Sequence, residues 1–366
     1  MRYIWQQTNW PDLRWRNEDL VGQLAKVRHQ QGRLLGRMEA MGFPLREEAV
    51  LHTLTEDVLK SSEIEGEILD KDQVRSSIAR RLGLDVGGLV PADRNVEGVV
   101  EMMLDATQHY SERLTQKRLF AWHAALFPTA YSGMRKIRVA KWRDDSEGPM
   151  QVVSGAIDRE KVHYEAPPAE ALAGEMKQFL KWFETNQGTD PVIKAGVAHL
   201  WFVTIHPFDD GNGRIARAVA DMALARSDNT AQRFYSMSAR IRAERNDYYN
   251  MLEKTQKGDV DITHWLSWFL ACLQRALDGA DVTLGSVIGR AEFWQRHADV
   301  ALNERQRAVL LRFLNNFEGK LTSSKWAILA KTSQDTASRD IADLVKKRIL
   351  MKDEGGGRST SYSLVG

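Results

Sequence analysis

Apolar side chains recur at intervals of three and four residues along most of the chain, which predicts amphipathic helices packed on one another. The clearest stripe runs from Leu172 to Phe183, and a second helical pattern begins at Val192. The first 90 residues also have a helical pattern, after a start rich in tryptophan. The helical period lapses between residues 133 and 168. The pattern therefore predicts a mainly α protein with a short β segment near its middle.

The irregular stretch contains two segments with strand character, Arg138–Trp142 and Gln151–Val153. The sequence RDDSEGP lies between them and supplies the residues that favour turns. This order predicts a β-hairpin, and the alternative is a plain surface loop.

The helix predicted from Val192 leads into a segment with much polar chemistry, His206–Arg217, of sequence HPFDDGNGRIAR. Glycines on both sides of Asn212 allow the backbone to turn successive N–H groups inward, and the helix that restarts at Arg214 adds a positive N-terminus. Arg214 and Arg217 lie one helical turn apart, so both guanidinium groups can reach one polyphosphate. The segment predicts a site for a phosphate-bearing ligand. The alternative is a helix–loop–helix with a capping aspartate and surface arginines.

Two further groups in this segment have chemistry that suits such a site. The carboxylate of Asp210 lies beside the predicted anion site, where a bridging Mg²⁺ would offset its repulsion of phosphate. His206 ends the preceding helix and is the group here that takes a proton near neutral pH.

The segment resembles the signature of Fic proteins, HxFx(D/E)GNGRxxR, and matches it at every defined position. The resemblance implies an enzyme that transfers AMP from ATP to a Ser, Thr or Tyr hydroxyl of a protein and releases pyrophosphate. It implies that His206 is the base, that Phe208 anchors the loop and that Asp210 holds Mg²⁺. The implied phosphate ligands are Gly211, Asn212 and Gly213 as an anion hole, Arg214 on the β-phosphate and Arg217 on the γ-phosphate.

In the same resemblance the predicted hairpin is a flap that covers the nucleotide and holds the target segment by strand addition. Tyr248 and Tyr249 correspond to a position that lines the adenine pocket, and Gln256 falls where the family often has an asparagine. The predicted ATP-binding set is Glu65, Val152, Val153, Ser154, Gly155, Gly211, Asn212, Gly213, Arg214, Ile215, Ala216, Arg217, Tyr248, Tyr249 and Gln256.

A helical stripe in the N-terminal region ends in Ser61 and Glu65, which places an acid where a buried-facing residue needs a partner. Pairing with a nearby lysine, or capping of a neighbouring helix, is the structural explanation. The stretch SSEIEG, which ends at Gly66, also resembles the inhibitory motif (S/T)xxxE(G/N) of Fic proteins. That resemblance implies that Glu65 pairs with Arg217 and keeps the γ-phosphate from its productive position.

The chain from residue 303 onward is basic, with 12 Lys and Arg against 7 Asp and Glu, whereas the whole chain has a net charge of +2. Three helical segments and two strand-like segments around GGGRST resemble a winged helix-turn-helix with GGGR as the wing tip. Such a module binds DNA if its recognition helix is exposed, and it serves equally well in dimerisation or substrate docking. Residues on or near the predicted recognition helix are Ser338, Arg339, Lys346 and Lys347.

Composition adds few constraints. The one cysteine, Cys272, rules out an internal disulfide and lies in an apolar helical run, where core packing is expected. The start of the chain lacks the apolar core of a signal peptide, and the longest apolar run, Trp265–Leu273, is too short to span a bilayer. We therefore expect a cytoplasmic protein without a membrane segment. His123 has no metal-like partner spacing, so a structural role is expected.

These observations predict three parts: an N-terminal helical regulatory region (1–90), a Fic-type catalytic domain with a hairpin flap (91–285) and a winged helix (295–366). The expected partners are ATP with Mg²⁺, a protein substrate that includes the chain itself, a second copy in a homodimer, and DNA through the winged helix. The hypothesis from another class is a DNA-binding regulator that senses nucleotide. Within the enzyme class, the same site would also serve to remove AMP from a modified protein or to transfer another nucleotide.

Overall fold

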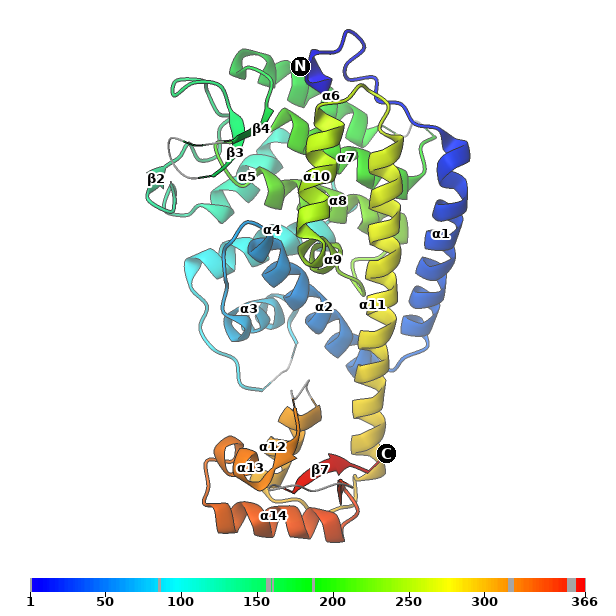
Figure 1. Ribbon diagram of the computed structural model, residues 1–366, viewed down its shortest axis with the longest axis vertical. Coiled ribbons are helices and arrows are strands. Elements are labelled where there is room, and N and C mark those ends of the chain that lie inside the picture. The colour runs from blue at the N-terminus through cyan, green and yellow to red at the C-terminus, as the bar shows by residue number, and fades with distance from the viewer. Residues whose placement is uncertain are drawn as a thin grey trace. The chain divides into compact units, whose positions relative to one another are not determined.

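The computed structural model describes residues 2–84, 87–155, 159, 161–185, 188–314, 319–353 and 360–365 (Figure 1). The chain divides into two compact units, Met1–Leu284 and Gly285–Gly366. Both are mainly helical, which confirms the predicted class. Boundaries within the first unit stay a prediction.

Within the described residues, no helix combines the length and the apolar character that crossing a membrane requires.

The first unit is built of helices that surround α7 and α8 (Figure 1). Its helices are η1 (Ile4–Gln6), α1 (Asn17–Glu39), α2 (Phe43–Ile64), α3 (Lys71–Leu82), α4 (Arg94–Gln108), α5 (Gln116–Leu126), η2 (Ala169–Ala171), α6 (Leu172–Glu184), α7 (Pro191–Ile205), α8 (Asn212–Asp228), α9 (Met237–Ala243) and α10 (Arg245–Gln256), followed by the start of α11 (Thr263–Arg296).

The core of this unit lies along α7, which is apolar on all sides and is buried from Val192 to Ile205 apart from the half-buried Lys194. A helix without a polar face is stable in a soluble protein only when other elements cover it. Here α8 packs along α7, and α6 adds the predicted stripe from Leu172 to Phe183. Cys272 is buried in α11, as expected from its apolar surroundings.

Among the residues that the structure describes, the strands of the first unit form two small antiparallel pairs. One pair joins β1 (Tyr131–Ser132) to β2 (Arg135–Lys136), and the other joins β3 (Gln151–Ser154) to β4 (Lys161–Glu165). The predicted strand at 151–153 is therefore present, and its partner strand follows it in the sequence.

The prediction of a strand at Arg138–Trp142 is wrong. The backbone N–H of Arg138 donates to the carboxylate of Asp209, and that of Ala140 donates to His123 Nδ1. The next residue after this stretch, Arg143, donates its N–H to the carbonyl of Pro207. Because the loop after α7 and helix α5 engage these donors, the segment follows that loop and does not pair with β3.

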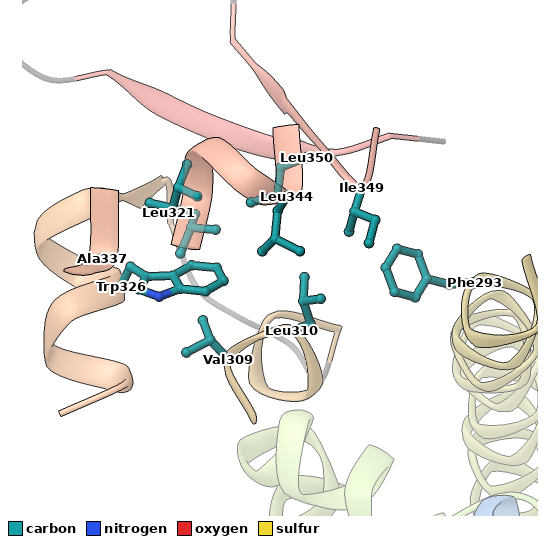
Figure 2. Packing of buried hydrophobic residues seen from close by; sticks show 10 residues of the cluster. Phe293, Val309, Leu310, Leu321, Trp326, Ala337, Leu344, Ile349 and Leu350 are labelled. Carbon is teal, nitrogen blue, oxygen red and sulfur yellow. The ribbon is translucent and has the colours of Figure 1, made fainter. Parts of the chain in front are cut away.

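The second unit contains three helices and three short strands among its described residues, together with the end of α11. They are α12 (Glu304–Leu314), β5 (Leu321–Thr322), α13 (Ser323–Leu329), α14 (Gln334–Lys346), β6 (Leu350–Lys352) and β7 (Ser361–Leu364). The strands form an antiparallel sheet in the order β5-β7-β6. Figure 2 shows Trp326, Val309, Leu310 and Leu344 turned toward one another in its core.

Helix α14 buries Ile341 and Leu344 and leaves Ser338, Arg339 and Lys346 exposed. Lys347 follows the helix, and its Nζ donates to the carbonyl oxygen of Ala301 at 2.8 Å. The predicted wing tip, residues 355–358, lies outside the described residues. The winged-helix assignment of this unit stays a prediction.

Candidate active site

His206 lies at the C-terminal end of α7 in the left-handed backbone region, with φ 50° and ψ 60°. Its Nδ1 lies 3.2 Å from the carbonyl oxygen of Val203. Since a carbonyl only accepts, Nδ1 carries the proton and Nε2 is the nitrogen that can take one. Burial lowers the pKa of His206 below its usual range, and the guanidinium of Arg143 acts in the same direction. The imidazole is therefore neutral at pH 7, as a general base must be.

The loop after His206 is closed by a side chain. Asn212 accepts from the N–H of Phe208 at 2.9 Å and donates to its carbonyl oxygen at 2.8 Å. Phe208 is fully buried, and its ring stacks on that of His123 with 4.2 Å between centroids. Gly211 has φ 79°, and a Cβ there would lie 2.9 Å from the ring of Phe127. The loop therefore requires glycine at that position.

His123 supports this loop from α5. Its Nδ1 accepts from the N–H of Ala140 at 3.2 Å, so its Nε2 carries a proton toward the carbonyl oxygen of Asp210, also at 3.2 Å. Burial lowers the pKa of His123 to about 4, so the ring is neutral. These contacts agree with the predicted structural role.

The side chain of Asp210 lies directly before the loop glycine Gly211. One carboxylate oxygen accepts from the N–H of Gly211 at 2.6 Å, and the other accepts from the hydroxyl of Ser132 on β1. A carboxylate oxygen of Asp210 and the hydroxyl oxygen of Ser132 on β1 thus lie side by side. Mg²⁺ prefers oxygen ligands of this kind.

Arg217 is almost completely buried and is bound to the end of α2. Its Nε donates to the hydroxyl of Ser61 at 3.0 Å, and its Nη2 donates to the carbonyl oxygen of Ser61 at 2.8 Å. The same Nη2 lies 2.8 Å from a carboxylate oxygen of Glu65. The structure therefore contains the ion pair between Glu65 and Arg217 that the sequence predicts.

The carboxylate of Glu65 lies directly against the first turn of α8. A Cβ built on Gly213 would be 2.2 Å from Glu65 Oε1. Helix α2 leads into Glu65, and the chain turns directly after it at Gly66, which has φ 86°. The first turn of a helix attracts anions because its N–H groups are unpaired. Glu65 thus lies where the sequence predicts phosphate.

A second acid, Glu67, pairs with the other arginine of the site, and the sequence analysis missed it. Arg214 Nη1 lies 2.6 Å from Glu67 Oε2, and the side chains are 7% and 36% exposed. The guanidinium of Arg214 also covers the ring of Phe127 at 5.1 Å. Ile68, the next residue along the chain, is 88% exposed. The only sequence signal for Glu67 is its spacing, two residues after Glu65.

The predicted adenine-pocket residues lie on α10 in three different settings. Tyr248 is buried, and its hydroxyl is 2.9 Å from Nε2 of His199, which makes it a packing residue. The ring of Tyr249 lies under the guanidinium of Arg245 at 5.0 Å. Gln256 is buried, with Nε2 3.4 Å from the carbonyl oxygen of Val203 at the end of α7.

The remaining residues of the predicted ATP-binding set divide by exposure. The side chains of Ile215 and Ala216 are fully buried in the core, so only their backbone can face a ligand. Val152 is half-buried on β3, whereas the adjacent stretch Val153–Gly155 is exposed.

Arg143 is a further residue that the sequence analysis did not identify. Its side chain is buried, and its Nε donates to the carbonyl oxygen of His206 at 2.8 Å. Its Nη2 donates to the carbonyl oxygen of Pro167, at the exit of the β3–β4 hairpin. One side chain thus joins His206 to the hairpin. An arginine within a turn-rich stretch has no sequence signal for this role.

Two segments of the chain match known protein families. Residues 113–224 match the Fic/DOC family, and residues 3–84 match a domain of unknown function, DUF4172. The protein adenylyltransferase Fic of Drosophila grimshawi is 27% identical over 222 residues, which are 59% of this chain and 40% of that protein. The protein of the same name from Nematostella vectensis is 33% identical over 115 residues, 31% of this chain and 25% of that protein.

The chain thus spans less than half the length of these relatives. A crystal structure of a Fic family protein from Desulfovibrio desulfuricans G20 has the same fold, with a TM-score of 0.55, 21% identity and coverage of 100% of this chain and 99% of that one. The matched Fic/DOC segment contains the whole stretch from α5 to the arginines of α8. Residues 113–224 of this chain therefore form a Fic/DOC domain.

Proposed function

We propose that the chain is a protein adenylyltransferase, which transfers AMP from ATP to a hydroxyl side chain of a protein. The observation that carries the proposal is a neutral His206 with Nε2 available, next to a glycine loop and the two arginines of α8. The relatives named protein adenylyltransferase Fic support the same assignment.

In the proposed reaction the acceptor hydroxyl attacks the α-phosphorus of ATP in line with the leaving group. The new bond joins the acceptor oxygen to the α-phosphorus, the bond to the bridging oxygen breaks, and pyrophosphate leaves. Nε2 of His206 takes the hydroxyl proton, while the Nδ1 contact with Val203 keeps the ring oriented. The N-terminus of α8 and Arg214 stabilise the charge on the phosphates.

A magnesium ion fits this proposal at Asp210. Proteins commonly hold Mg²⁺ with one or two carboxylates together with substrate phosphates and water. Asp210 and the hydroxyl of Ser132 supply oxygen donors of that kind. When bound, the ion would neutralise charge on the phosphate oxygens.

We further propose that the observed state is self-inhibited. Glu65 occupies the Arg217 guanidinium and lies against the first turn of α8. A γ-phosphate that needs the same guanidinium must displace the carboxylate, and the two anions repel each other. Removing the Glu65 carboxylate should therefore raise transfer.

A second candidate, a nucleotide-sensing regulator that binds DNA, is favoured by the exposed Arg339 and Lys346 on α14. That function needs no proton acceptor at His206, so it predicts nucleotide binding without transfer. Under this candidate, DNA affinity should fall steeply with salt.

The test is incubation of wild type, Glu65→Gly and His206→Ala with Mg²⁺, an added protein mixture and ATP labelled on the α-phosphate. We expect label on proteins of the mixture with Glu65→Gly, less with wild type and none with His206→Ala, although the last still binds ATP. Equal transfer by His206→Ala would remove its role as the base. ATP binding without transfer by every variant would favour the regulator.

A further inference from the structure

Helix α2 brings another acid, Asp57, against an acid of α8, on the side away from the phosphate site. Asp57 lies one helical turn before Ser61, and Asp221 lies one turn after Arg217. The two acids are 5% and 2% exposed. Their carboxyl groups lie within hydrogen-bonding reach of each other. The contact that holds Arg217 on α2 therefore continues, one turn further along both helices, as a buried pair of acids.

This pair needs a proton. Two ionised carboxylates cannot bond to each other, because each only accepts. Asp57 Oδ1 accepts from the hydroxyl of Ser236 and from the N–H of Ser238, the latter at 3.3 Å. Asp221 Oδ1 accepts from Arg233 Nη2 at 3.0 Å, whereas its Oδ2 is buried and has no donor among the residues that the structure describes. One proton shared between Asp57 and Asp221 supplies the missing donor.

The cations near the pair do not remove this need. The charged and titratable groups around it come from α8 and from the segment that follows: Arg217, Asp228, Arg233 and Tyr235. Arg233 is shared, because its Nη1 also lies 3.5 Å from Asp228 Oδ2. Burial and the carboxylate of Asp57 raise the pKa of Asp221 well above its usual range, although Arg233 and Arg217 act in the opposite direction.

The proton is bound only while α2 packs on α8. Two separate aspartates in water have a pKa of about 3.9, so both are ionised at neutral pH. Closure of α2 on α8 therefore takes up one proton. The gain from this proton is complete below the ordinary pKa of aspartate, and it is lost as the pH rises through the raised pKa of the closed pair. The closed state should weaken with rising pH, by at most about tenfold per pH unit.

We propose that Asp57 and Asp221 form a proton-binding site that controls the inhibitory helix. The shared proton holds α2 on α8, and its loss to water releases Glu65 from Arg217, because Asp57, Ser61 and Glu65 follow one another along α2 and its end. The inference deepens the proposed self-inhibition and rests on the proposed function.

The first experiment looks for the proton without nucleotide. The full chain is prepared with isotope-labelled aspartate, and infrared spectroscopy separates protonated carboxyl groups from carboxylates. We expect a band of a protonated aspartate at neutral pH, which disappears as the pH rises and is absent in Asp57→Asn and in Asp221→Asn. Glu56→Gln is the matched control and should keep the band, because Glu56 is the neighbour of Asp57 on α2 and lies 3.7 Å from Lys71.

A wild-type spectrum without this band overturns the inference, whatever the enzymatic activity. A band that persists in both Asp57→Asn and Asp221→Asn belongs to another acid and overturns it as well.

The second experiment measures inhibition against pH. The inhibition factor is the rate of AMP transfer with Glu65→Gly divided by the rate of the same chain with Glu65, so effects of pH on His206 cancel. We expect the factor to fall as the pH rises in wild type and in Glu56→Gln. With Asp57→Asn it should stay constant, because an amide N–H donates to Asp221 and does not dissociate.

A factor that is independent of pH in wild type, or one that still falls with Asp57→Asn, overturns the inference. If Asp57→Asn does not fold, Asp221→Asn makes the same comparison, since its amide can donate to Asp57. A lack of AMP transfer by Glu65→Gly at every pH overturns the proposed function instead, and the infrared band then decides whether the pair binds a proton.

Discussion

At the scale of single residues, the protonation state of His206 depends on the charges that face it. Arg143 disfavours the imidazolium form, whereas Glu65 and Asp210 favour it, and burial decides in favour of the neutral ring. Since the proposed base must be neutral, its lowered pKa should keep AMP transfer active as the pH falls toward the ordinary histidine value of about 6.5. The acidic limb of the rate profile should therefore lie below that value.

Replacing Arg143 tests this arrangement. In Arg143→Gln the cation beside His206 is lost, so the pKa of His206 rises and the acidic limb of kcat moves to higher pH. The loss of the bond from Nε to the His206 carbonyl oxygen should also lower kcat more than it changes KM for ATP. A pH profile of AMP transfer measures both effects. Arg138→Gln, in the same segment but half-exposed, should leave the limb in place.

Replacing Glu67 tests the ion pair that it forms with Arg214. Glu67→Gln keeps the size of the side chain but removes the charge that pairs with Arg214. Because Glu67 is 36% exposed, solvent weakens the pair, and we expect ATP affinity to rise only a few-fold. Titration calorimetry with ATP measures the change. Glu63→Gln is the control, since Glu63 pairs with Lys60 and Arg242, and unchanged affinity in Glu67→Gln would remove Glu67 from the site.

At the scale of elements, the sequence predicted what local periodicity and a long motif determine. Helices α6, α7 and α8 follow from apolar spacing, and the loop between α7 and α8 follows from its glycines. The contacts of Asp57, Glu67 and Arg143 were not predicted, because each partner lies far away in the chain. The strand at 138–142 was predicted wrongly for the same reason.

Helix packing gives a stability prediction. A Cβ on Gly98 of α4 would lie 1.8 Å from the carbonyl oxygen of Ala125 on α5, so Gly98→Ala must move the two helices apart. We expect a loss of about 1–3 kcal/mol in the free energy of unfolding. Gly174→Ala on α6 is the control, since nothing lies within 4 Å of its Cβ and alanine favours helix. Thermal denaturation of both variants should separate them, and equal midpoints would contradict the packing described.

At the scale of the whole molecule, each compact unit has its own buried core. A ligand that binds one unit should therefore stabilise that unit without the other. We expect two unfolding transitions in scanning calorimetry. ATP should raise the midpoint temperature only of the transition that belongs to Met1–Leu284. Trp326→Ala removes the largest buried side chain of the second core. It should lower the free energy of unfolding of Gly285–Gly366 alone, by about 3–5 kcal/mol. A single transition that responds to both changes would contradict this independence.

The buried Cys272 makes the chain suitable for attaching a single dye. Burial raises the pKa of its thiol to about 12, so little thiolate forms at neutral pH and maleimide reagents should leave it unmodified. Ile68→Cys would then be the one reactive position, at a site that is 88% exposed and directly follows Glu67. Fluorescence from a dye attached there would report in real time when the turn that carries both acids leaves the arginines of α8.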